Sequence, residues 1–195
     1  MTTSIRIMTV CTGNICRSPM AEIVLRERLD AAGLGAHVVV DSTGVSSEEV
    51  GNPIDRRART VLVAAGYSDS ALDTHRARRT DAADLTERDL VVAMTADHAR
   101  VLRRLADGAG QPRQAGQPRH AGATGEPALI RMFRSFDPQA TAVTEQRDEH
   151  RLDVEDPWYG GIEDFEVCLD QVEAAVDGIV EHVRSHLARH GHLGD

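Results

Sequence analysis

The stretch from Cys11 to Ser18, which reads Cys-Thr-Gly-Asn-Ile-Cys-Arg-Ser, constrains the fold of this chain more than any other feature. An apolar run rich in β-branched residues, 5–10, precedes it, and a helical pattern begins near Pro19. A strand, a tight glycine-containing loop and a helix start form an anion site, because loop N–H groups converge there and the helix dipole adds partial positive charge. Arg17 adds a planar, permanently charged group that can bind two phosphate oxygens.

Cys11 lies where the predicted strand meets this loop. Nearby positive charge favours the thiolate, which is the nucleophilic form of cysteine. A thiolate at the base of a phosphate-binding loop is placed to attack phosphorus and form a phosphocysteine. The other reading, a structural cysteine buried behind a strand, gives no reason for an arginine at the end of the loop. We therefore interpret Cys11 as the nucleophile and Arg17 as the phosphate-binding residue.

Residues 10–22, Val-Cys-Thr-Gly-Asn-Ile-Cys-Arg-Ser-Pro-Met-Ala-Glu, resemble the low-molecular-weight protein tyrosine phosphatases without a gap. The resemblance extends over residues 5–106 and 129–186. It implies a cysteine-dependent phosphoric monoester hydrolase whose partner is a phosphotyrosine-containing protein and which needs no metal or other cofactor. It also implies that phosphate or a similar oxyanion is bound by the loop residues Thr12, Gly13, Asn14, Ile15, Cys16 and Arg17.

A departing phenolate needs a proton, and the candidate donor is Asp156 in Asp-Pro-Trp-Tyr-Gly, residues 156–160. On the residues alone, Asp-Pro is typical of an ordinary turn. The segment resembles the mobile general-acid loop of the family. The resemblance implies that Asp156 donates a proton to the leaving oxygen and then, as a carboxylate, activates water. Glu155 is the second candidate, because no proline follows it.

Four residues are candidates for supporting the loop. Ser18 either caps the following helix or forms a hydrogen bond with the Cys11 sulfur, and the two roles are compatible. The resemblance implies that Asn14 holds the loop in a strained shape through contacts with Ser18, Ser42 and His75. On its own, His75 would be interpreted as an ordinary surface histidine.

Thr12, Glu48, Trp158 and Tyr159 are the residues that we expect around the substrate. Many family members carry a tryptophan where this chain has Glu48. An anionic side chain there weakens stacking on a tyrosine ring, which leaves Trp158 and Tyr159 to supply it. Thr95 stands where the family usually has aspartate, so we expect a supporting carboxylate to be missing.

Three alternatives remain open. Arsenate reductases of the same fold need further cysteines to relay electrons, and this chain has none between Cys16 and Cys168. Phosphoarginine phosphatases of this type carry threonine where this chain has Ile15, which favours a phosphotyrosyl ester. A non-catalytic phosphate-binding module would be expected to lack Cys11, Arg17 or Asp156, and all three are present.

The order of elements predicts an α/β fold, a single three-layer domain over residues 1–195 with a four-stranded parallel sheet and helices on both faces. Ligands bind such sheets beyond the carboxyl ends of the strands, where the loop after residue 10 begins. The predicted strands are 5–10, 37–41, 89–94 and 129–133, and the predicted helices are 19–32, 55–65, 97–106 and 164–190. Residues 108–127, rich in glycine and proline, are predicted to be a mobile insertion loop.

Composition limits the partners and the location. The net charge of −9 argues against nucleic-acid binding, because nothing would offset phosphate repulsion. No apolar stretch is long enough to cross a membrane, and no signal peptide is visible. Three cysteines, an odd and low number, favour a reducing cytoplasm. The resemblance implies that Cys16 forms a disulfide with Cys11 under peroxide, and Cys168 is interpreted as a core residue.

Overall fold

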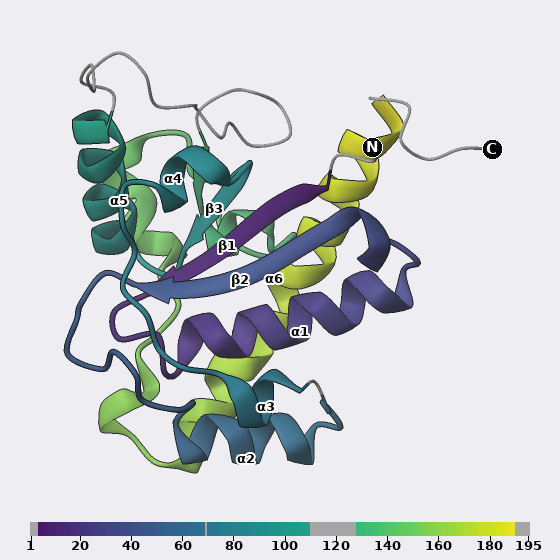
Figure 1. The fold of residues 1–195 in the computed structure, drawn as a ribbon, viewed down its shortest axis with the longest axis vertical. Coiled ribbons are helices and arrows are strands. Elements are labelled where there is room, and N and C mark those ends of the chain that lie inside the picture. The colour runs from purple at the N-terminus through teal and green to yellow at the C-terminus, as the bar shows by residue number, and fades with distance from the viewer. Residues whose placement is uncertain (1–3, 69, 110–127, 190–195) are drawn as a thin grey trace.

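The computed structural model describes residues 4–68, 70–109 and 128–189. Its centre is a four-stranded parallel sheet in the order β2-β1-β3-β4 (Figure 1). The chain passes from β1 to β2 on one side and then to β3 on the other, so the winding reverses beside β1. Ligands bind open α/β sheets at such a point. The strands are β1 (Ile5–Cys11), β2 (Val38–Gly44), β3 (Leu90–Ala93) and β4 (Leu129–Met132).

Helices and short turns connect the strands. The helices are α1 (Arg17–Ala31), α2 (Arg56–Ala64), α3 (Ala71–Thr74), α4 (Asp84–Glu87), α5 (Ala96–Ala109) and α6 (Ile162–Arg189). The 3₁₀ turns are η1 (Gly35–His37), η2 (Phe133–Phe136), η3 (Gln146–Leu152) and η4 (Pro157–Tyr159). No helix in the described ranges is long and apolar enough to cross a membrane.

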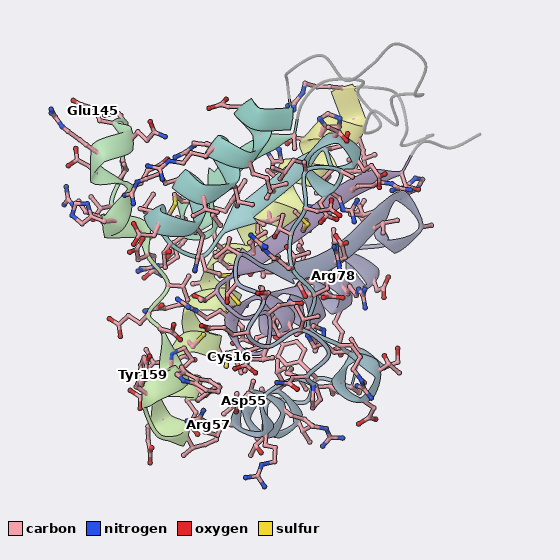
Figure 2. All side chains as sticks on the ribbon, turned by 60° about the vertical axis from the view of Figure 1, so that its left-hand side comes forward. Cys16, Asp55, Arg57, Arg78, Glu145 and Tyr159 are labelled. Atoms are coloured by element: carbon pink, nitrogen blue, oxygen red, sulfur yellow. The ribbon has the colours of Figure 1, made fainter. Side chains whose placement is uncertain are left out.

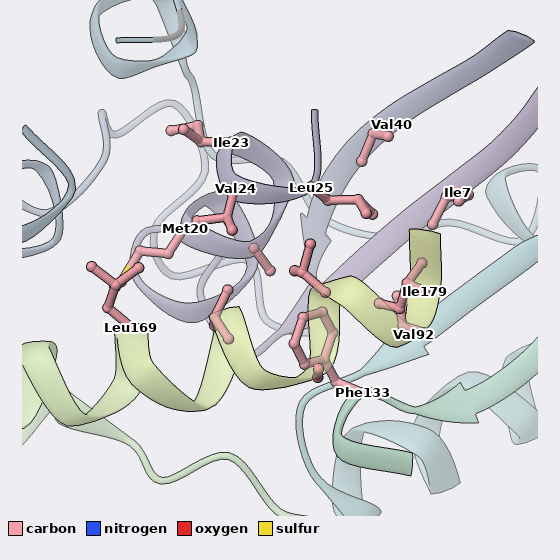
Figure 3. Packing of buried hydrophobic residues seen from close by; sticks show 14 of the residues in the cluster. Ile7, Met20, Ile23, Val24, Leu25, Val40, Val92, Phe133, Leu169 and Ile179 are labelled. Atoms are coloured by element: carbon pink, nitrogen blue, oxygen red, sulfur yellow. The ribbon is translucent and has the colours of Figure 1, made fainter. Parts of the chain in front are cut away.

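Side chains of β1 alternate between two apolar clusters, as a strand covered on both faces requires. Ile5 and Ile7 lie in the larger cluster, which α1 and α6 complete on one face of the sheet (Figure 3). Met8 and Val10 lie in the second cluster with α4 and α5 on the other face. The predicted three-layer α/β fold with a four-stranded parallel sheet is therefore confirmed.

Several predicted boundaries are wrong. Helix α1 begins at Arg17, so Ser18 lies inside the first turn and does not cap it. Strand β2 continues to Gly44, because Gly44 pairs with Cys11 and its N–H donates to the Arg78 carbonyl at 2.9 Å. Helix α5 continues through Ala109, so the predicted loop does not begin at 108, and residues 110–127 lie outside the described ranges.

Candidate active site

The loop between β1 and α1 is fixed by hydrogen bonds to its carbonyl oxygens. The carbonyls of Cys11, Thr12, Asn14 and Ile15 accept from Val45 N (3.0 Å), Ser46 N (2.9 Å), His75 Nε2 (2.7 Å) and Asp55 N (2.8 Å), respectively. A trans peptide unit points its C=O and the following N–H in opposite directions. The N–H groups of residues 12, 13, 15 and 16 therefore point away from these neighbouring segments, toward the inner side of the loop, where an anion can bind.

Asn14 is the one non-glycine residue with positive φ in the described ranges, at 61°. Asparagine tolerates this left-handed conformation better than most residues. Its side chain is fully used: Nδ2 donates to the hydroxyls of Ser18 (3.0 Å) and Ser42 (2.8 Å), and Oδ1 accepts from Arg78 N (2.9 Å). His75 completes the support. Burial lowers the pKa of His75, and its Nε2 must carry hydrogen because a carbonyl oxygen only accepts.

The Cys11 sulfur is buried at the end of β1 between two hydrogen-bonding groups. The Asn14 N–H donates to Sγ at 3.3 Å, and the Ser18 hydroxyl lies 3.0 Å from it. Ser18 also donates to the Thr43 carbonyl at 3.1 Å. A hydroxyl has a single hydrogen, and an ionised sulfur is the stronger acceptor. Ser18 can therefore turn its hydrogen toward Cys11 when the sulfur carries negative charge.

The Arg17 guanidinium is buried and held from two sides. Nη1 donates to the Val154 carbonyl at 3.2 Å, and Nη2 donates to the Thr12 hydroxyl at 3.2 Å. Nη2 also pairs with Asp156 Oδ2 at 2.5 Å. Nε is buried and has no hydrogen-bond partner among the described residues. A buried donor without a partner is costly, so this edge of the guanidinium is suited to an oxyanion that supplies the acceptor.

His98 is a site residue that sequence reasoning missed. It is 5% exposed, and its Nε2 lies 2.9 Å from the Thr12 hydroxyl that Arg17 also contacts. Burial lowers its pKa to about 4, with a smaller contribution from the nearby Arg17 charge, so the ring is neutral at pH 7. No sequence motif marks His98. It reaches the loop because α5 begins at the end of β3, next to β1 in the sheet.

Asp156 lies immediately before η4, in a segment fixed at its start by Asp153 and Val154. The Val154 N–H donates to the Met94 carbonyl at 2.8 Å, and Asp153 Oδ1 accepts from Ala96 N at 2.7 Å. Asp153 therefore supplies a carboxylate at the start of α5, next to Thr95. Asp156 Oδ1 accepts from Trp158 N at 3.2 Å. Its carboxylate thus faces Arg17 and the oxyanion position.

A model of the family described as low molecular weight phosphotyrosine protein phosphatase matches residues 6–189. The chain belongs to this family. The chain is 42% identical over 182 residues to a low molecular weight protein-tyrosine-phosphatase of Streptomyces coelicolor, which covers 93% of this chain and 95% of that relative. It is 39% identical over 191 residues to low molecular weight protein-tyrosine phosphatase A of Mycobacterium tuberculosis, and the match covers 98% of this chain and 99% of that relative.

Solved structures agree with this assignment. The crystal structure of a protein tyrosine phosphatase from Entamoeba histolytica, with Hepes in its active site, has a TM-score of 0.71 at 26% identity. It covers 94% of this chain and 99% of that chain. Family membership over nearly the whole length confirms the expectation that the chain is an enzyme of the protein tyrosine phosphatase class.

The residues expected around the substrate of this family member lie in different settings. Trp158 is 40% exposed and Tyr159 is 93% exposed. Glu48 is exposed, whereas its neighbour Glu49 lies against the loop: a Cβ at Gly13 would be 2.9 Å from the Glu49 Cγ. Sequence reasoning missed Glu49, because neighbouring residues of one type cannot be told apart without the course of the backbone.

The other two cysteines have surroundings that suppress ionisation. Both Cys16 and Cys168 are buried free thiols. Burial raises the pKa of Cys16 well above its usual range, and the nearby Asp55 carboxylate raises it further. Burial raises the pKa of Cys168 to about 12, and its place in the core is as predicted. Figure 2 shows Cys16, Asp55, Arg57 and Tyr159 at the same end of the molecule.

Proposed function

We propose that the chain hydrolyses phosphotyrosine in proteins through a phosphocysteine on Cys11. The observation that carries the proposal is the Arg17 guanidinium, whose buried Nε has no hydrogen-bond partner within residues 4–68, 70–109 and 128–189, while Nη2 contacts Asp156. An oxyanion beside Nε would lie within the loop that holds the Cys11 sulfur. Family membership favours the same substrate class.

In the first step, the Cys11 thiolate attacks phosphorus and the bond from phosphorus to the tyrosyl oxygen breaks. Loop N–H groups and Arg17 bind the phosphoryl oxygens, whose charge builds up in the transition state. An entering phosphate replaces Asp156 on the guanidinium and leaves the carboxyl group beside the leaving oxygen. Once away from the guanidinium, Asp156 takes up a proton from solvent and then gives it to that oxygen, so that a neutral phenol departs.

In the second step, water attacks the phosphocysteine. The Asp156 carboxylate takes a proton from the water, and the bond between phosphorus and sulfur breaks as phosphate forms. The departing thiolate accepts hydrogen bonds from the Asn14 N–H and from the Ser18 hydroxyl, which stabilise its charge. Phosphate leaves, Asp156 releases to solvent the proton that it took from water, and its carboxylate pairs with Arg17 again.

A panel of three assays tests the proposal: hydrolysis of a phosphotyrosine peptide, hydrolysis of phosphoarginine, and reduction of arsenate. We expect hydrolysis of the peptide only, unaffected by EDTA, and its loss in Cys11→Ser, which should still bind inorganic phosphate. Preferential hydrolysis of phosphoarginine, or turnover by Cys11→Ser, would contradict the proposal. We also propose that the protein is cytoplasmic, because its three cysteines are free thiols, which a reducing compartment favours.

A further inference from the structure

Arg57 in the first turn of α2 contacts the segment that carries Asp156, although its side chain does not reach Asp156 itself. Its Nη1 donates to the carbonyls of Trp158 (3.2 Å), in the middle of η4, and Gly160 (2.9 Å), which follows η4. The guanidinium carbon lies 5.6 Å from the Trp158 ring centroid and 4.6 Å from that of Phe165 in α6. One side chain therefore joins α2, η4 and α6.

The other edge of the Arg57 guanidinium is bound to Asp55. Nε and Nη2 donate to Asp55 Oδ1 (3.1 Å) and Oδ2 (3.0 Å), a two-bond pairing that only arginine can make. Asp55 also caps α2 through the Arg57 N–H at 2.7 Å. Burial raises the pKa of Asp55, but these hydrogen bonds outweigh it and hold the pKa below its usual value. The pair is thus charged and geometrically fixed.

Asp55 continues this connection into the phosphate-binding loop, because its backbone N–H donates to the Ile15 carbonyl at 2.8 Å. An unbroken chain of hydrogen bonds runs from Ile15 through Asp55 and Arg57 to the carbonyls on the far side of Asp156. On the near side, Arg17 Nη1 and the Met94 carbonyl hold Val154. The backbone is therefore held by hydrogen bonds on both sides of Asp156, and Arg57 makes those on the C-terminal side.

We propose that Arg57 is a positioning residue for general acid catalysis: together with Asp55, it sets the place of the Asp156 carboxyl relative to the phosphate-binding loop. The inference rests on the proposed function, since it concerns the step that Asp156 performs. The Arg57 side chain bonds to Asp55, Trp158 and Gly160, so its proposed effect on the reaction passes through Asp156. Displacement of a catalytic group by about 1 Å can cost roughly 100-fold in rate.

Leaving-group dependence separates this role from a structural one. With Asp156 in place the leaving oxygen is protonated as it departs, so kcat/KM varies little with the basicity of the phenol. In Arg57→Ala we expect kcat/KM to fall by roughly 10- to 100-fold for a phosphotyrosine peptide, whose phenol is basic. We expect a much smaller fall for p-nitrophenyl phosphate. The inhibition constant for inorganic phosphate should not change.

A double variant tests whether Arg57 acts through Asp156. In an Asp156→Ala background, Arg57→Ala should cause no further loss of kcat/KM toward the phosphotyrosine peptide, because residues that act as a unit are not additive. Arg57→Lys keeps the charge but not the two-bond pairing and should behave like Arg57→Ala. Arg56→Ala removes an exposed neighbouring arginine and should match the wild type. If Arg57→Ala does not fold, Arg57→Met is used in its place, because it keeps an apolar side chain of similar length.

Trp158 gives a direct readout of the contact, because it is the single tryptophan of the chain. In the ligand-free protein, Arg57→Ala or Arg57→Met should shift its emission to longer wavelength and increase its quenching by acrylamide, and Arg56→Ala should do neither. Fluorescence unchanged by the loss of Arg57, an equal loss of kcat/KM for all phenols, or additive losses in the double variant would overturn the inference. Failure of the wild type to hydrolyse any aryl phosphate would instead contradict the proposed function, while the fluorescence comparison would still decide the contact.

Discussion

Thr12 shows how a single hydroxyl can orient the phosphate-binding arginine. It accepts a hydrogen bond from Arg17 Nη2 and lies 2.9 Å from His98 Nε2. We expect Thr12→Val to weaken binding of inorganic phosphate by about tenfold, since hydrogen bonds to charged groups contribute roughly 1.5–3 kcal/mol. Competitive inhibition by phosphate measures this. Thr12→Ser keeps the hydroxyl and should bind phosphate like the wild type; equal weakening in both variants would show that the methyl group matters instead.

In the proposed mechanism Asp156 has two distinguishable effects, because its carboxylate contacts Arg17 and its proton goes to the leaving group. Asp156→Asn should reduce kcat for a phosphotyrosine peptide by roughly 10²–10⁴, the usual contribution of general acid–base catalysis. The same variant should bind inorganic phosphate at least as tightly as the wild type, since no carboxylate then competes for the guanidinium. Steady-state kinetics and phosphate inhibition check both. Undiminished turnover would show that another residue is the general acid. Glu155 is the second candidate, so Glu155→Gln would then be measured.

At the level of elements, the end of β2 determines the shape of the phosphate-binding loop. A Cβ at Gly44 would lie 2.4 Å from the Thr12 carbonyl oxygen and 3.0 Å from the Asn14 nitrogen, both backbone atoms that cannot turn aside. Gly44→Ala should therefore displace the loop and lower kcat/KM by about 100-fold, the scale expected for an ångström of misplacement. Gly108→Ala in α5, where no atom of the described residues lies within 4 Å of the added Cβ, is the matched control and should keep full activity. Equal activity of the two variants would contradict this account of the loop.

Element boundaries show what local sequence can and cannot predict. The apolar runs and the helical spacing were sufficient to predict the four strands and the longer helices. The end of β2 was missed because pairing with Cys11 and Arg78, rather than residue preference, extends it to Gly44. The start of α1 was missed because serine is a residue type that commonly caps helices. In the structure the Ser18 hydroxyl lies beside the Cys11 sulfur and caps no helix.

At the scale of the whole molecule, the sheet order decides which distant residues reach the site. The motif around Cys11 and the Asp-Pro segment were recognisable in the sequence. His98, Glu49 and Arg57 were not, because they reach the site only after β2 and β3 have paired on either side of β1 and α6 has packed across α2. Local patterns carry no information about such contacts, so the residues that position the chemistry are less predictable than those that perform it.

His98 also links this architecture to the pH dependence of global stability. Its pKa is lowered to about 4, first by burial and then by Arg17, from an ordinary value of 6.5. Between these values the unfolded chain binds a proton that the folded chain does not, so stability falls as pH decreases from about 6.5 to about 4. The loss attributable to His98 should be about 3 kcal/mol over this window, at 1.36 kcal/mol per pKa unit.

His98→Gln removes the titrating ring while keeping a polar side chain. Urea unfolding followed by circular dichroism at pH 7, 5.5 and 4.5 should show a shallower decline in the variant than in the wild type. The decline should not vanish, because burial also lowers the pKa of His75 and of His182. If His98→Gln loses stability as steeply as the wild type over this window, the neutral buried ring is not what couples the fold to pH.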